Sequence, residues 1–360
     1  MRFHNLQLLR VLAAVAVVGY HLDHYGRALF TAPAESTAVF SLWGFTGFAV
    51  PLFFALSGFV LTHALHSTPP ARYLLARILR LYPGYWLALI VATVLISDGS
   101  LLADARTIAR RMTKVELFLW PGGTTVDRMY LLGIEWSLFY EVELSVSLAA
   151  LSLLGLRWGL PTAAIVWLGV IGLKMVVWPG YATELIPHWR TVLLSAFNVP
   201  FLFGVLAYYL RNTGQRWRWV VLAGLGMVVG VGIPRVTDGE QLWCLWGLAG
   251  ALAVWFAVQV PQLSERNPFA RLGDCTYGLF LIHVPVMMAV FRRAKSHGWE
   301  VGTVAGLLTA AVVALVGGLL FGWIESRIHN RLRPLAKVRL SDLQARWRLG
   351  MVGLVRMARR

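Results

Sequence analysis

The chain has 360 residues, of which 58% are hydrophobic and only 14% are charged. Because ordinary soluble domains carry roughly 25% charged residues, this composition excludes a soluble globular domain and predicts a polytopic membrane protein. The formal net charge of +16 does not imply nucleic acid as a partner, since much of it lies in a basic C-terminal tail that an anionic membrane surface attracts.

Apolar stretches of roughly membrane length indicate an all-α, polytopic integral membrane helix bundle with about ten transmembrane helices. In chain order the expected spans are 6–22, 40–65, 83–96, 130–156, 160–178, 191–210, 220–233, 242–260, 277–291 and 301–324. We expect one membrane domain, 1–333, without a cleaved signal peptide. The two cysteines suggest neither a disulfide framework nor a metal site, and we expect no bound metal.

The first span carries two ionisable residues, Arg10 and His21. Eleven residues at about 100° each place them about 20° apart around a helix and about 16 Å apart along it. Ionisable groups inside a membrane are costly and usually face a protein interior or a wet cavity, so this pair is a functional candidate. The alternative is that Arg10 extends to the interface and His21 is an interfacial polar residue.

The next two spans add a serine and a pair of arginines. Ser57 and Gly58 lie deep in the second span, where small residues also serve close helix packing. Arg77 and Arg80, three residues apart, share a helical face just before Pro83. Two guanidinium groups at the entrance of a span suit an anionic ligand, although they also fit the ordinary excess of cytoplasmic positive charge.

The fourth and ninth spans contain further ionisable residues. Glu135, Glu141 and Glu143 are costly in an apolar span unless paired or protonated, and one of them is a candidate to pair with Arg10 or to orient an imidazole. His283 lies in the middle of the ninth span, next to a proline. A lone buried histidine is also compatible with a purely structural role.

Residues 334–360 combine apolar positions spaced by three or four with arginines between them. This pattern predicts a basic amphipathic helix that lies on the anionic inner leaflet and anchors the chain. With the N-terminus in the cytoplasm, the inner side holds 20 lysines and arginines against 11 outside. Without the tail the count is 10 against 11, so the prediction that both termini are cytoplasmic rests on the tail.

Taken together and in this order, the motifs resemble acyltransferase family 3, the membrane acyltransferases that modify bacterial surface glycans and some small molecules. The matching features are Arg10 and His21 as the arginine–ten residues–histidine signature, FFALSGFVLT at 53–62, Arg77 and Arg80 followed by LYPGYW, WSLFYE at 136–141, the pattern of Gly273, Thr276, Tyr277 and His283, and Glu325 after the last span. The chain departs from the family in having Thr276 where serine is frequent and Arg327 where proline is frequent.

The resemblance implies a stand-alone acyltransferase of the bacterial cytoplasmic (inner) membrane that uses acyl-CoA as co-substrate. The donor would enter from the cytoplasmic side, and a carbohydrate hydroxyl outside would accept the group. The acceptor would belong to a surface or exported polysaccharide or its lipid-linked precursor. Acetyl is the group that the family most often transfers.

The residues fit this function in named roles. We expect Arg77 and Arg80 to hold the CoA phosphates. His21, with Glu141 as its candidate orienting partner, would act as general base or transient acyl carrier. Arg10 would steady the bound thioester or pair with a carboxylate. Further candidates are Ser57, Tyr277, His283 and Glu325.

Two other classes of membrane protein are alternatives to an acyltransferase. A proton-coupled secondary transporter also uses intramembrane Arg, His and Glu, but should show inverted repeats and paired broken helices, which the sequence does not display. A structural membrane protein would have no need for so many ionisable residues within its spans.

Overall fold

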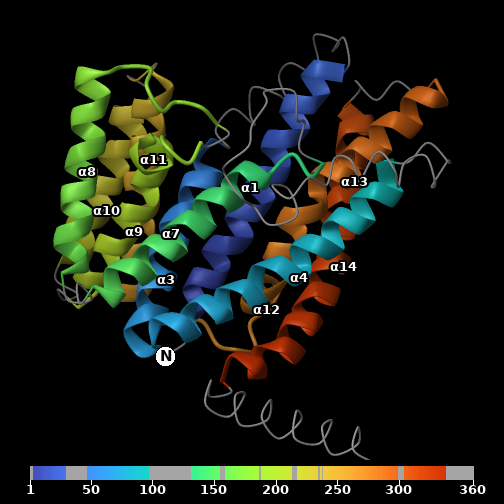
Figure 1. Cartoon of the computed structure of the whole chain (residues 1–360). Coiled ribbons are helices and arrows are strands. Elements are labelled where there is room, and N and C mark those ends of the chain that lie inside the picture. The colour runs from blue at the N-terminus through green and yellow to red at the C-terminus, as the bar shows by residue number, and fades with distance from the viewer. Residues whose placement is uncertain are drawn as a thin grey trace, which may run out of the picture.

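The computed structural model describes residues 3–29, 47–96, 131–154, 159–185, 188–212, 217–233, 236, 238–298 and 304–337. Within these ranges all regular elements are helical, and they pack side by side into one bundle (Figure 1). The predicted all-α membrane bundle is thereby confirmed. The tail helix is predicted over 334–360. Its first residues belong to the short 3-10 helix η8 (Arg333–Lys337), and the rest, from 338 onward, lies outside the described residues.

Helices that are long and apolar enough to cross a membrane number seven in the described part of the chain. They are α1 (His4–Leu29), α3 (Ala49–Ser67), α4 (Pro70–Ile96), α8 (Leu160–Val177), α11 (Gly239–Gln259), α13 (Thr276–Ser296) and α14 (Val304–Leu332). Three more apolar helices accompany them: α7 (Glu135–Leu153), α9 (Val199–Leu210) and α10 (Arg218–Met227). Each of the ten expected spans overlaps one of these helices, and α12 (Pro268–Leu272) leads into α13.

Helix α4 begins at Pro70, thirteen residues before the expected start of the third span at Pro83. Pro83 lacks a backbone N–H, so a helix that continues through it leaves the carbonyl of Leu79 without its usual partner. Nδ1 of His329 in α14 donates to this carbonyl at 3.4 Å, which satisfies the freed group. As a result Arg77 and Arg80 lie within a long helix and not in the connection before it.

Two helix pairs approach so closely that only glycine fits between them. An added Cβ at Gly58 of α3 would meet the backbone of Phe201 in α9, and one at Gly204 would meet the backbone of Ala55. In the same way Gly278 of α13 lies against Gly322 of α14. Small residues at a helix contact let the backbones pack tightly in a membrane. The packing interpretation of the Ser57-Gly58 motif therefore applies to Gly58.

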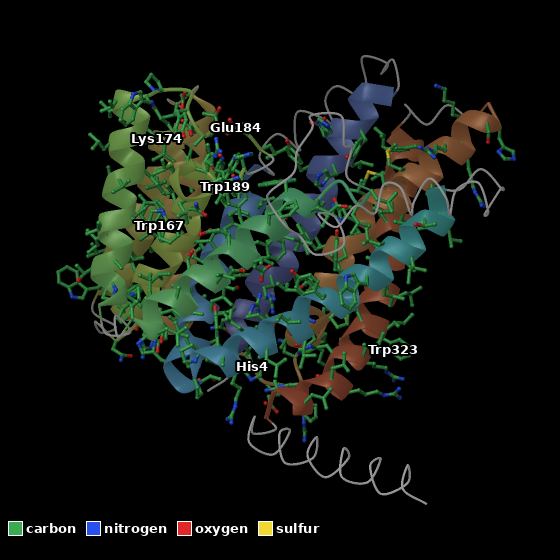
Figure 2. All side chains as sticks on the ribbon, viewed as in Figure 1. His4, Trp167, Lys174, Glu184, Trp189 and Trp323 are labelled. Carbon is green, nitrogen blue, oxygen red and sulfur yellow. The ribbon has the colours of Figure 1, made fainter. Side chains whose placement is uncertain are left out.

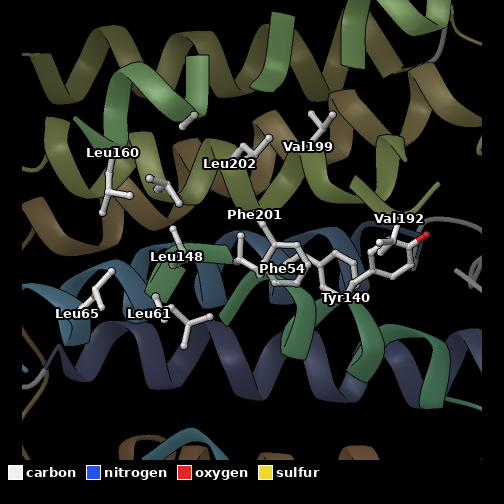
Figure 3. Close-up of a cluster of buried hydrophobic side chains, with 14 of the residues drawn as sticks. Phe54, Leu61, Leu65, Tyr140, Leu148, Leu160, Val192, Val199, Phe201 and Leu202 are labelled. Atoms are coloured by element: carbon white, nitrogen blue, oxygen red, sulfur yellow. The ribbon is translucent and has the colours of Figure 1, made fainter. Parts of the chain in front are cut away.

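The core between α3, α7 and α9 combines aromatic rings with leucine and valine side chains (Figure 3). The rings of Phe54 and Phe201 stack with their centroids 4.1 Å apart, and Tyr140 of α7 packs beside Phe54. The hydroxyl of Tyr140 donates to Oγ of Ser195 at 3.0 Å. These contacts fix the rotation of α7, so Glu141, the next residue, turns toward a different set of helices.

A buried ion pair joins α8 to α11. Nζ of Lys174, only 2% exposed, lies 2.9 Å from Oε1 of Glu240. In Figure 2, Lys174 and Glu184 lie toward one end of the bundle, and His4 and Trp323 toward the other. Since α1 begins and α14 finishes near that second end, both ends of the described chain lie on the same side of the bundle (Figure 1).

Candidate active site

A pocket lies between α1, α3, α4, α7 and α13 and encloses about 770 Å³, including the part open to the surroundings. Its polar lining consists of Arg10, Ser57, Arg77, Arg80, Ser137, Glu141, Thr276 and Tyr277. Its apolar lining consists of Val50, Phe53, Phe54, Leu56, Val60, Leu61, Leu81, Leu138 and Phe280. Along α3 the lining runs from Val50 to Leu61, which is about 16 Å of helix. The pocket is therefore elongated along the bundle.

Arg77 of α4 forms an ion pair with Oε1 of Glu141 in α7. Both side chains are partly buried, so the pair is shielded from water more than a surface ion pair would be. Nε of Arg77 is buried and has no hydrogen-bond partner among the described residues. The guanidinium group thus keeps an unused donor beside the pocket.

Arg80 of α4 pairs with Glu325 of α14, with 2.6 Å between Nη1 and Oε1. Its guanidinium carbon lies 4.6 Å from the ring centroid of Tyr277, whose hydroxyl donates to the carbonyl of Leu81 at 2.8 Å. Glu325 is 2% exposed, and within the described chain its second oxygen has no partner. Gly84 permits this arrangement, since a Cβ there would lie 2.8 Å from Cγ of Glu325.

Arg10 of α1 completes a group of three guanidinium groups on the pocket wall. Its Nη1 donates a long hydrogen bond of 3.5 Å to Oε1 of Gln7, one turn earlier on the same helix. Two carboxylates, Glu141 and Glu325, stand against these three positive charges. Asp274 also lies near Arg10, since Nε2 of Gln7 donates to its Oδ1 at 3.3 Å. Arg77 and Arg80 are thus each paired with a carboxylate, whereas the hydrogen bond of Arg10 goes to a neutral amide.

The imidazoles of His21 in α1 and His283 in α13 face each other inside the bundle. Nδ1 of His21 lies 3.0 Å from Nε2 of His283, and the residues are 9% and 0% exposed. Nδ1 of His283 lies 2.8 Å from the carbonyl of Phe280 and 3.2 Å from that of Leu279. Carbonyls only accept, so Nδ1 of His283 carries the proton and its Nε2 accepts.

The same reasoning fixes the proton on His21. Nδ1 of His21 is also 3.1 Å from the carbonyl of Val17, so this nitrogen donates to the carbonyl and to His283. Nε2 of His21 is then left as the basic nitrogen. A neutral imidazole held in one tautomer with a basic nitrogen is the arrangement that a general base or a nucleophile requires.

The three guanidinium groups and the histidine pair lie at successive depths of the bundle. On α1, Arg10 precedes His21 by eleven residues, about 16 Å. On α13, which lies beside α1, Tyr277 contacts Arg80, and His283 follows six residues later. Neither imidazole is among the described residues that line the pocket. The lining does reach Phe280, whose ring centroid is 6.0 Å from that of His283.

Comparison with known proteins identifies the family of the chain. A family model described as an acyltransferase domain, that of acyltransferase family 3, matches residues 3–324. The chain belongs to acyltransferase family 3. This membership makes it a multi-pass membrane O-acyltransferase and agrees with the resemblance of its motifs.

Two curated members of the family are similar to this acyltransferase. Nodulation protein 10 of Rhizobium leguminosarum bv. viciae is 22% identical over 88% of this chain and 92% of its own length. Protein 2 in the picA locus of Rhizobium radiobacter is 33% identical over 44% of this chain and 83% of its own length. No solved structure matches the chain.

Most of the sequence-predicted site residues of this acyltransferase gather in one region. Those that line the pocket are Arg10, Ser57, Arg77, Arg80, Glu141 and Tyr277. Glu325 joins them through Arg80, and His21 and His283 form the pair at the far end. Glu141 lies against Arg77, and the group that contacts the imidazole of His21 is His283. The prediction that Glu141 orients His21 does not agree with this geometry.

Sequence reasoning did not connect His21 with His283 or each arginine with its carboxylate. These contacts join residues 64 to 262 positions apart, and no helical spacing relates them. Phe53 and Phe280, which line the pocket on the side of the histidines, were also missed because aromatic residues in an apolar span carry no distinguishing pattern. The sequence pointed to the site through the ionisable residues in the spans and the short motifs around them.

Proposed function

We propose that this acyltransferase moves an acyl group, acetyl in the first place, from acyl-CoA on the cytoplasmic side to a hydroxyl of a carbohydrate acceptor outside the bacterial inner membrane. The observation that carries the proposal is the succession along α1 and α13 of guanidinium groups, an elongated apolar pocket and a histidine pair. An extended donor with polyanionic and acyl ends matches this succession in both polarity and shape.

The guanidinium end suits the phosphates of CoA. Arginine binds phosphate through its planar fork of donors, and such charge-assisted bonds are short and strong. Arg10, whose hydrogen bond to Gln7 is long, and Nε of Arg77, without a partner among the described residues, have donors to offer. The pairing of Arg77 and Arg80 with carboxylates keeps both guanidinium planes oriented before the donor arrives.

The apolar stretch suits the uncharged arm of the donor, and the histidine pair suits the transfer step. Nε2 of His21 accepts the proton of the acceptor hydroxyl while the hydroxyl oxygen attacks the thioester carbonyl carbon. The new C–O bond replaces the C–S bond, and the CoA sulfur leaves as a thiol with the proton that His21 returns. A two-step route, in which Nε2 of His21 first carries the acyl group, uses the same nitrogen.

The proposed orientation places the N-terminal end of α1 and the basic tail in the cytoplasm. Both ends of the described chain lie on one side of the bundle, and the basic tail favours the cytoplasm for that side. The carbohydrate acceptor follows from the family's common chemistry alone. The rival assignment, a proton-coupled transporter, shares the intramembrane ionisable residues, but the family match over residues 3–324 favours acyl transfer.

The test measures binding of radiolabelled acetyl-CoA to the purified chain in lipid nanodiscs, for wild type and for the R77A/R80A double variant. We expect saturable binding that the double variant loses. R72A serves as the matched control, because Arg72 lies on the same helix and is not among the pocket's lining residues. The double variant R77E/E141R exchanges the two partners and keeps an ion pair. It therefore tests whether a loss of acetyl-CoA binding comes from misfolding.

The results have clear meanings. Binding that fails in R77A/R80A and survives in R72A supports a CoA site at the guanidinium end. Equal binding in all variants removes Arg77 and Arg80 from the donor site. A folded wild-type chain that binds no acyl-CoA contradicts acyl-CoA as the donor, and with it the proposed function.

A further inference from the structure

Two phenylalanine rings stand at the end of the pocket that faces the histidine pair. Phe53 of α3 and Phe280 of α13 both line the pocket, and their ring centroids are 5.6 Å apart at an interplanar angle of 58°. Both side chains are partly buried. Rings that touch from two different helices leave little room for another group to pass between them.

Their position along the helices places them between the two chemical parts of the site. Phe280 lies three residues after Tyr277, which contacts Arg80, and three residues before His283. Its ring centroid is 6.0 Å from that of His283, and its carbonyl accepts from Nδ1 of that histidine. The two rings therefore border the histidine pair, and a thioester that reaches the imidazoles would bring its acyl group against them.

The space behind the rings is filled. Phe53 and Phe280 pack on a cluster of small apolar residues, Ala16, Val17 and Ala49, which are at most 8% exposed. Val17 also supplies the carbonyl that holds Nδ1 of His21. Thus the rings touch both the pocket and the framework of the histidine pair.

We propose that Phe53 and Phe280 close the acyl end of the pocket and restrict the donor to a short acyl group. The inference rests on the proposed function, because it requires the pocket to hold acyl-CoA with its phosphates at the guanidinium groups. The acyl group is then the terminal part of the donor, and each added methylene pushes against the rings. Phe53 and Phe280 determine specificity and take no part in proton transfer.

The experiment measures the dissociation constants of CoA, acetyl-CoA, butyryl-CoA and hexanoyl-CoA for the purified full chain in nanodiscs. Binding is used because it needs no acceptor. In wild type we expect hexanoyl-CoA to bind at least about tenfold more weakly than acetyl-CoA, since one unaccommodated methylene already changes selection roughly 10–200-fold. In F280A and F53A this difference should shrink to less than about threefold.

The matched control is F59A. Phe59 is a fully buried phenylalanine on α3, the helix that carries Phe53. It packs in a core cluster with residues of α1, α9 and α11 and does not line the pocket. Its truncation should leave the ratio between hexanoyl-CoA and acetyl-CoA as in wild type. Thermal unfolding of every variant identifies any that fail to fold, and F280L, F53L and F59L then replace the alanine variants.

The outcomes separate the two proposals. A wild-type chain that binds hexanoyl-CoA as tightly as acetyl-CoA overturns the length limit, and so does an unchanged ratio in folded F280A and F53A. A change of the same size in F59A would show a general loosening of the bundle and would also overturn it. If wild type binds neither CoA nor any acyl-CoA, the proposed function itself fails.

Discussion

Nδ1 of His21 and Nε2 of His283 lie 3.0 Å apart, although 262 residues separate them in the chain. The backbone carbonyls around His283 leave its Nε2 as an acceptor, and this acceptor keeps the proton of His21 on Nδ1. The basic nitrogen of His21 is thus determined by a residue on another helix. In the proposed mechanism His283 would act on the reaction through the tautomer of His21.

The first prediction separates catalysis from donor binding at this pair. His21→Ala should lower acyl transfer by about 10²–10⁴-fold, the usual contribution of a general base. Its dissociation constant for acetyl-CoA should stay near that of wild type, since the imidazole does not line the pocket described here. Transfer of radiolabelled acetyl to an acceptor in isolated membranes measures the first quantity, and nanodisc binding the second.

A second prediction concerns His283 as a positioning residue. His283→Leu removes the acceptor for Nδ1 of His21 and should lower transfer by at least about tenfold, equivalent to about 1.4 kcal/mol. His283→Gln keeps an acceptor oxygen and should recover a large part of the lost activity. If the leucine and glutamine variants were equally active while both are folded, the tautomer argument would be wrong.

The Arg80–Glu325 pair predicts strong coupling in stability. Removal of one partner leaves a buried charge uncompensated, which costs about 3–5 kcal/mol, whereas removal of both is much milder. Denaturant unfolding in detergent micelles should therefore show R80Q and E325Q each less stable than R80Q/E325Q. Additive losses in the double variant would mean that water already screens the pair.

Glycine packing gives a prediction with opposite signs at two positions. Gly58→Ala forces the backbones of α3 and α9 apart and should destabilise the bundle by about 1–3 kcal/mol. Gly224→Ala, in α10, has open space around its Cβ and should be neutral or stabilise by up to about 1 kcal/mol through helix propensity. Thermal unfolding of both variants in one detergent checks the contrast.

Both ends of the described chain lie on one side of the bundle, which predicts that both termini are on the cytoplasmic side of the membrane. Fusions of a fluorescent reporter that matures only in the cytoplasm should be bright at both termini. A periplasm-specific phosphatase at the same positions should be inactive. Opposite results at the two termini would contradict the same-side arrangement seen in Figure 1, and two active phosphatase fusions would reverse the proposed orientation.

The sequence was informative wherever a local pattern determines the outcome. The spacing of Arg10 and His21 predicted that the two side chains share one face of a helix, and in the structure both point into the bundle: Arg10 lines the pocket and His21 contacts His283. Apolar length predicted the spans, because a membrane-crossing helix must satisfy its backbone within itself. The same logic failed at Pro83, since the partner of the freed carbonyl, His329, comes from a helix about 250 residues later.

The contacts that pair the ionisable side chains of the site with one another join different helices. Glu141 stands one residue after Tyr140, whose ring is held in the aromatic core, and this rotation directs Glu141 to Arg77. Nothing in the spacing of the fourth span distinguishes that partner from Arg10 or His21. Which helices become neighbours decides the pairing, and a single sequence without homologues does not contain that information.

Helix α1 runs unbroken from His4 to Leu29 and carries both Arg10 and His21. The distance between the charged end of the site and the basic nitrogen is therefore set by a rigid rod, at about 1.5 Å for each residue. One residue inserted between them would turn His21 by about 100° away from His283, whereas a whole inserted turn would restore its direction but lengthen the site by about 5 Å. The first helix thus fixes the distance that the proposed donor would have to span between the guanidinium groups and His21.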